Sequence, residues 1–111
     1  MRIVLQLLPC ALLLLPLAVS VADDQAVLTF ERDVRPIFKA ACFQCHGEEE
    51  DHRGGLDIRL VRLMRKGGDS GPAIDPRNTA ASLIWQRIEN DEMPEGEKKL
   101  SASQKLIIRR W

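Results

Sequence analysis

The sequence lacks net charge, because its 16 lysine and arginine residues are balanced by 16 aspartate and glutamate residues. A nucleic-acid-binding domain needs excess positive charge to neutralise phosphates, so we expect no nucleic-acid partner. The chain also lacks internal repeats and any useful length of alternating polar and apolar residues. Because strands show that two-residue alternation, its absence predicts an all-α protein. With 111 residues, the chain has room for one small domain at most.

The one long apolar run lies at the start of the chain and contains no acidic residue. Arg2 supplies a short positive region, residues 7–18 are rich in leucine, and Ser20-Val21-Ala22 places small side chains where a signal peptidase cleaves. We therefore predict that residues 1–22 are a signal peptide. The protein is expected to be exported, to the periplasm or another extracytoplasmic space, and to contact the membrane only if this leader stays uncleaved.

Cysteine is scarce after the leader, where only Cys42 and Cys45 remain. A domain of this size has a small core and often needs a disulfide, a metal or a large cofactor to stabilise it. Any such stabilising group is expected to use these two residues.

Helix-forming patterns occupy much of residues 33–111, the predicted domain, which follows a lead-in over residues 23–32. Asp33 is a candidate N-cap, and the apolar residues after it recur at helical spacing: Val34, Ile37, Phe38 and Ala41. Up to three further short helices are expected, separated by long glycine-rich loops. Their terminal signals are Gly67-Gly68 after the second, Asn78 or Thr79 before the third, and a Ser101–Gln104 capping box before the last. The last helix has no stop signal, so we expect it to be truncated, as in a fragment of a longer chain.

The residues Cys42-Phe43-Gln44-Cys45-His46 have the spacing of a c-type haem attachment site. In such a site the two thiols add to two porphyrin vinyl groups, and the adjoining imidazole reaches the iron from below the ring. We therefore predict one covalent haem c, bound through Cys42 and Cys45, with His46 as the proximal iron ligand.

Three other uses of these cysteines stay open at this stage. A redox dithiol of the thioredoxin type would need a βαβ setting, which the pattern does not contain. A zinc site would have to combine Cys42, Cys45, His46 and His52, and two adjacent ligands would strain a tetrahedral shell. A disulfide between Cys42 and Cys45 would close a loop too short to stabilise the domain much.

A second iron ligand is expected from the loop before Pro94, where Met93 precedes a proline that restricts the backbone. Met64 lies at apolar helical spacing and is expected to fill the core, whereas His52 is expected to be a solvated surface residue. The proximal histidine also needs an acceptor for its other ring N–H. The carbonyl of Pro72, in a proline-restricted loop, is one candidate, and an ordinary turn at Gly71-Pro72 is the equal alternative.

Taken in order, the residues from Cys42 to His46, Gly71-Pro72 and Met93-Pro94 resemble a class I cytochrome c domain. A narrower similarity is to the planctomycete-type cytochrome C domain, which usually opens long exported proteins. It is carried by residues 34–38, 42–47, 54–56, 66–73, 82–83 and 91–94. Two positions depart from that family: Arg59 stands where an acidic helix cap is common, and Glu95 stands where a second proline is frequent.

The resemblance implies a small all-α fold of three to four helices around one haem, with the first and last helices crossing beside the haem edge. It implies that Cys42 and Cys45 form the thioethers, that His46 and Met93 bind the iron, and that the Pro72 carbonyl accepts from His46. We expect an electron carrier rather than an enzyme, which exchanges electrons with a redox partner protein or a fused domain. A haem enzyme, or a sensor of gas or peroxide, with a labile distal ligand is the alternative.

Overall fold

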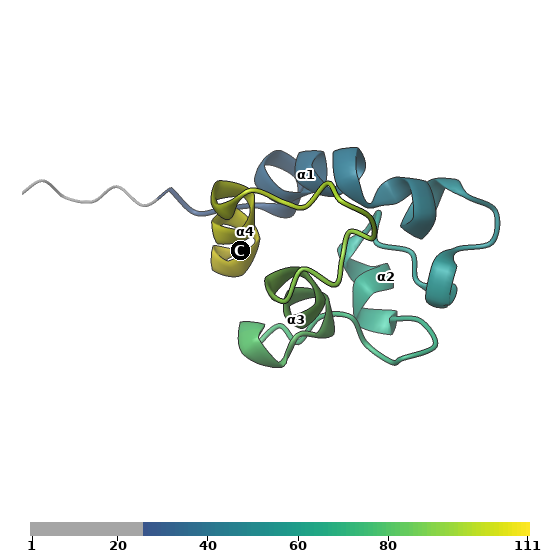
Figure 1. The fold of residues 1–111 in the computed structure, drawn as a ribbon. Helices are drawn as coiled ribbons and strands as arrows, with labels where there is room; N and C mark the ends of the chain where they lie inside the picture. The colour runs from purple at the N-terminus through teal and green to yellow at the C-terminus, as the bar shows by residue number, and fades with distance from the viewer. Residues whose placement is uncertain (1–25) are drawn as a thin grey trace, which may run out of the picture.

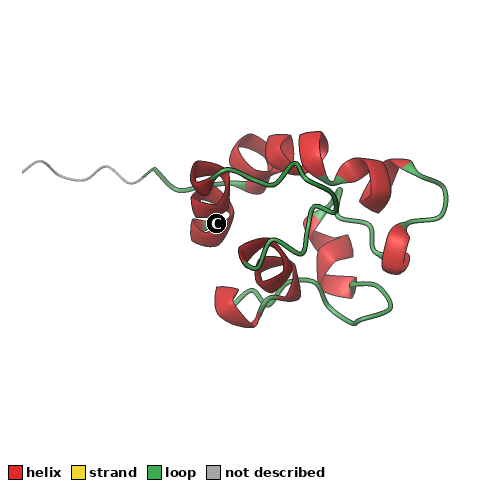
Figure 2. Ribbon diagram, viewed as in Figure 1, coloured by secondary structure: helices red, strands yellow, loops and turns green. Residues whose placement is uncertain are grey.

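The computed structural model describes residues 26–111, and all the regular structure in this range is helical (Figure 2). The α-helices are α1 (Arg35–Ala41), α2 (Val61–Lys66), α3 (Leu83–Glu89) and α4 (Ala102–Arg110). Shorter helical turns cover Phe30–Val34, Gln44–Glu48, Arg53–Gly55 and Thr79–Ala81. The predicted all-α class is confirmed for this part of the chain. The signal peptide predicted over residues 1–22 lies outside the described residues, as does the start of the lead-in.

Helical structure begins at Phe30, before the predicted cap, and continues without a break into α1. Thr29 is the N-cap, since its side chain accepts a hydrogen bond from the Arg32 N–H. The prediction that Asp33 caps the helix was therefore wrong. Asp33 lies inside the first turn, where its carboxylate accepts from the N–H of Thr29 at 2.6 Å. The side chains of Thr29 and Asp33 thus each accept from a backbone N–H at this helix end, as in a capping box lengthened by one residue.

The pH dependence of stability gives a test of this helix end. The pKa of Asp33 is lowered, chiefly by the hydrogen bond from the Arg32 side chain and then by the Thr29 N–H. A lowered pKa stabilises the fold above the ordinary carboxyl value of about 4, and this stabilisation is lost as the pH falls through the folded-state pKa. We expect Asp33→Asn to lower the thermal unfolding temperature slightly at pH 6 and by less at pH 2. A difference of equal size at both pH values would contradict this role.

The first and last helical segments pack together at one end of the molecule, where α4 lies beside the start of α1 (Figure 1). Phe30 joins them, because its ring lies 5.4 Å from the Trp111 ring and 6.2 Å from the Phe38 ring, centroid to centroid. The helix α3 also contacts α4. The predicted apolar stripe of the first helix is confirmed: Val34, Ile37 and Phe38 are buried, and Ala41 packs against the core.

Most of the predicted helix ends are confirmed. The helix α2 ends at Gly67, which has a φ of +77°, and its Met64 is fully buried in the core, as expected. Asn78 caps the turn before α3, and Ser101 and Gln104 form the capping box of α4.

In residues 26–111 no helix is both long and apolar enough to cross a membrane.

Candidate haem-attachment site

The Cys-x-x-Cys-His motif continues the helical path of α1. The Cys42 N–H donates to the Phe38 carbonyl at 2.8 Å, and the His46 N–H donates to the Cys42 carbonyl at 3.0 Å. Phe43 is buried in the core, while the two cysteines and His46 are half-buried. The buried phenylalanine therefore anchors the motif, and its three reactive side chains keep a partly accessible position.

The proximal histidine is held by the segment that follows the Arg53–Gly55 turn. Nδ1 of His46 lies 3.2 Å from the Leu56 carbonyl, and the Ile58 N–H donates to the His46 carbonyl at 2.9 Å. The Pro72 carbonyl was one candidate for this acceptor, with an ordinary turn at Gly71-Pro72 as the equal alternative, whereas here the Leu56 carbonyl lies beside Nδ1. In this structure Pro72 is exposed and does not line the cavity beside His46.

Local backbone geometry places Leu56 beside His46. Gly54 and Gly55 both have a φ of +63°, a conformation that glycine adopts easily and other residues rarely adopt. They turn the chain back so that Leu56 and Ile58 run alongside His46. The Gly54-Gly55 pair was a sequence signal for a tight return toward the motif, and it could have indicated Leu56 as the acceptor.

A cavity of about 340 Å³ lies between His46 and Met93. Its walls come from the motif, the segment after the Arg53–Gly55 turn, the turn after α2, the helix α3 and the loop after α3. Its apolar lining residues are Leu56, Ile58, Ala73, Leu83, Ile84 and Ile88. Cys42 and three charged residues, Arg53, Arg87 and Glu95, also line it. Met64, the other candidate thioether, does not line this cavity. The structure therefore brings His46 and Met93 to one cavity, while their ligation of iron stays a prediction.

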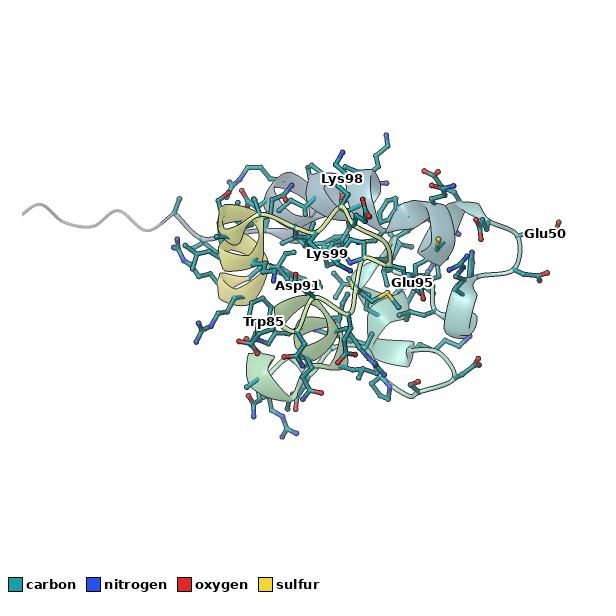
Figure 3. The ribbon with its side chains drawn as sticks, in the orientation of Figure 1. Glu50, Trp85, Asp91, Glu95, Lys98 and Lys99 are labelled. Carbon is teal, nitrogen blue, oxygen red and sulfur yellow. The ribbon has the colours of Figure 1, made fainter. Side chains whose placement is uncertain are left out.

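The loop that carries Met93 is fastened to the end of α3 through its backbone. The N–H groups of Glu92 and Met93 both donate to the Arg87 carbonyl, at 2.9 and 3.0 Å. Asp91 adopts a φ of +56° and accepts from the Lys105 ammonium of α4 at 2.8 Å. The Met93–Pro94 peptide bond is cis. Figure 3 shows Asp91, Glu95 and Lys99 around this loop. Two helices therefore fix the position of Met93.

The non-haem uses of the cysteines gain no support from the geometry. Burial, and then the neighbouring Cys45, raise the pKa of the Cys42 thiol to about 11, whereas a redox-active dithiol needs a lowered thiol pKa. Cys42 and Cys45 are unpaired thiols. Nε2 of His52 lies 3.2 Å from the Gly47 carbonyl, and within residues 26–111 no group of three or more His, Cys, Asp or Glu residues is arranged to hold a metal ion.

The donor set fits a covalently attached haem. Two thiols, one imidazole with an acceptor at its other nitrogen, and one thioether are the groups that attach and ligate a c-type haem. An apolar lining suits the body of a porphyrin, and the two arginines of the lining suit its carboxylates. The helical fold and this donor set are those expected of a cytochrome c domain, a class of protein whose haem transfers electrons.

The comparison with protein families agrees with this class. Residues 42–96, just under half of the chain, match the family model described as planctomycete cytochrome C, so this segment is similar to that family. The matched segment runs from the first cysteine of the motif to the residue after Glu95, so it contains both predicted iron ligands. No curated protein and no solved structure matches the chain significantly.

Proposed function

We propose that this domain carries one covalent haem c, attached through Cys42 and Cys45 and ligated by His46 and Met93, and that it transfers electrons in an exported protein. The observation that carries the proposal is the cavity that His46 and Met93 share, which the first cysteine of the motif, Cys42, also lines. The bound haem would supply the redox change, between ferric and ferrous iron. No substrate bond is made or broken in such a transfer.

The residues of this chain would serve the transfer by holding both iron ligands in place. The Leu56 carbonyl, at 3.2 Å, can accept from Nδ1 of His46, which fixes the ring orientation and leaves Nε2 for the iron. On the other side, the Arg87 carbonyl holds the backbone of Met93. Little rearrangement between the two oxidation states is expected when both ligands are fixed. Methionine ligation also raises the reduction potential.

The contacts of the Met93 loop favour an electron carrier over a haem enzyme or a sensor of gas or peroxide. Such proteins need a distal position that opens to an exogenous ligand. Here the distal candidate Met93 sits in a loop that is hydrogen-bonded to α3 and ion-paired to α4. A loop with these contacts supports a methionine that stays bound.

The proposed partners are a redox protein or a fused domain. A weak electron-transfer encounter buries a small area, and the near-neutral chain gives little overall electrostatic steering. The acidic run of residues 48–51 forms an exposed loop, with Glu50 far from α4 (Figure 3). This run can bias the orientation of a basic partner. Export is proposed on the leader-like residues 1–22.

The proposal is tested by expressing the full chain with the haem-attachment machinery in an oxidising compartment. Mass spectrometry should give the polypeptide mass, with the leader removed, plus one haem that survives denaturation. The ferric absorption spectrum should be low-spin and contain the weak methionine–iron charge-transfer band, and the ferrous protein should not bind carbon monoxide readily. A bare polypeptide mass would overturn the haem assignment. A haem protein that binds carbon monoxide at once would support the sensor or enzyme instead.

A further inference from the structure

One ion pair joins the two sides of the cavity. Nη1 of Arg53 lies 2.5 Å from Oε2 of Glu95, although the two residues are 42 positions apart in the sequence. Both side chains line the cavity between His46 and Met93. Each other ion pair described in residues 26–111 joins residues at most 14 positions apart. Among the ion pairs described, Arg53–Glu95 therefore joins the two residues that are farthest apart in the sequence.

The two residues belong to the two loops that present the expected iron ligands. Arg53 begins the turn Arg53–Gly55, and its carbonyl accepts from the N–H of Leu56, the residue whose own carbonyl faces His46. Glu95 lies two residues after Met93. The ion pair thus joins the loop behind the proximal histidine to the loop of the distal methionine.

Two other cationic side chains beside Met93, those of Arg87 and Lys99, already have partners. The side chain of Arg87 pairs with Glu92 on the α3 side, and the Lys99 ammonium donates to the Pro94 carbonyl at 2.5 Å. These contacts fasten the loop to itself and to α3. Among the contacts described for this loop, the Arg53–Glu95 pair is the one that reaches the segment holding the proximal histidine.

We propose that Arg53 and Glu95 are positioning residues that keep Met93 at the iron by joining the distal loop to the proximal loop. This inference rests on the proposed function, since it presumes a haem ligated by His46 and Met93. Displacement of Met93 by an external ligand requires the distal loop to move away. The ion pair opposes that movement, so breaking it favours the displaced state.

The expected effect is modest because both side chains are more than half exposed, at 58% and 62%. Exposed ion pairs contribute up to about 1 kcal/mol, which converts to roughly a threefold to fivefold change in an equilibrium constant. Salt screens such a pair. The displacement of Met93 is therefore expected to become easier at high ionic strength in the unmodified protein.

The test uses the haem-loaded protein and imidazole as the external ligand. Imidazole binding to the ferric form is titrated by the loss of the methionine–iron band, at low and high salt. We expect Glu95→Gln and Arg53→Gln each to bind imidazole roughly threefold to fivefold more tightly at low salt. The double variant should bind imidazole no more tightly than either single variant. The charge swap, Arg53→Glu with Glu95→Arg, should recover much of the original imidazole affinity. Unfolding midpoints should change little.

Glu31→Gln is the matched control. It removes the same charge and breaks another exposed ion pair, the one with Arg35, away from the cavity. Its imidazole affinity should equal that of the unmodified protein. Additive effects of the two single changes would overturn the proposed role of this ion pair. So would a change in imidazole affinity for Arg53→Gln when Glu95→Gln causes none. The latter result would mean that Arg53 serves another group, such as a haem carboxylate.

Failure of the proposed function is distinguishable from failure of this inference. An unmodified protein without a methionine–iron band would overturn the proposed ligation, and the inference with it. An unmodified protein that shows the band, with variants that bind imidazole no more tightly, overturns the inference alone.

Discussion

Met93→Ala is expected to abolish the methionine–iron charge-transfer band and to open the iron to carbon monoxide. Among the described residues that line the cavity, His46 and Met93 are the imidazole and the thioether, so no second neutral ligand can replace the lost sulfur. The reduction potential should fall by on the order of 0.1 V, a small part of the roughly 0.8 V range that axial ligands set. Absorption spectroscopy, carbon monoxide titration and a potentiometric titration measure these effects.

Met64→Leu is the matched control for Met93→Ala. Met64 is fully buried on α2, inside the core rather than at the cavity. A Met-to-Leu change nearly conserves volume and is expected to cost less than about 1.5 kcal/mol of the free energy of unfolding. The spectrum and the potential should stay unchanged. If Met64→Leu removed the band and Met93→Ala did not, the proposed distal ligand would be wrong.

Gly67→Ala is expected to destabilise the domain more than any other single change discussed above. A Cβ at this position would lie 1.9 Å from the Gly71 carbonyl oxygen and 2.3 Å from its carbon, and the φ of +77° also disfavours a side chain. The obstacle is backbone, so it cannot rotate away. We expect a loss of more than about 4 kcal/mol, a large part of the roughly 5–15 kcal/mol that stabilises a typical domain. Denaturant unfolding of the haem-loaded protein measures this loss.

The effect of Gly67→Ala should also reach the proximal side of the site. The turn after α2 packs on the turn before Leu56, because the Asp69 N–H donates to the Gly54 carbonyl at 2.8 Å. A displaced turn after α2 therefore moves the segment that supplies the acceptor to His46. A lower yield of attached haem is expected together with the lower stability.

Gly71→Ala separates the steric effect from the conformational one. Gly71 has a φ of +88°, and a Cβ there would meet nothing within 4 Å. Its cost is limited to placing a side chain in the left-handed region, about 1–2 kcal/mol. Equal losses of stability for Gly67→Ala and Gly71→Ala would contradict the proposed backbone clash.

Local features of the site could be predicted from the sequence because each depends on a few adjacent residues. The attachment motif depends on the spacing of Cys42, Cys45 and His46 along one helical turn. The capping box of Ser101 with Gln104 spans only four residues, and the positive φ of Gly67 follows from a glycine at a helix end. The assignment of Met64 to the core followed from its apolar spacing on a short helix.

The start of the first helix was predicted incorrectly because a long-range contact decides it. Thr29 and Asp33 are both good capping residues, and the sequence alone does not rank them. Packing decides between them, because Phe30 must enter the helix to place its ring against Phe38 and Trp111. The contact with Trp111 comes from the opposite end of the chain.

The class of this protein could be predicted from five consecutive residues, because thioether attachment and proximal ligation need no more than these. Which backbone and side chains surround the expected haem site follows only from the folded chain. Leu56 rather than Pro72 faces His46, and Arg53 meets Glu95 across the cavity. Such contacts depend on where the glycine turns direct the chain. The spacing of residues along the sequence does not give the distances between the segments that these turns bring together.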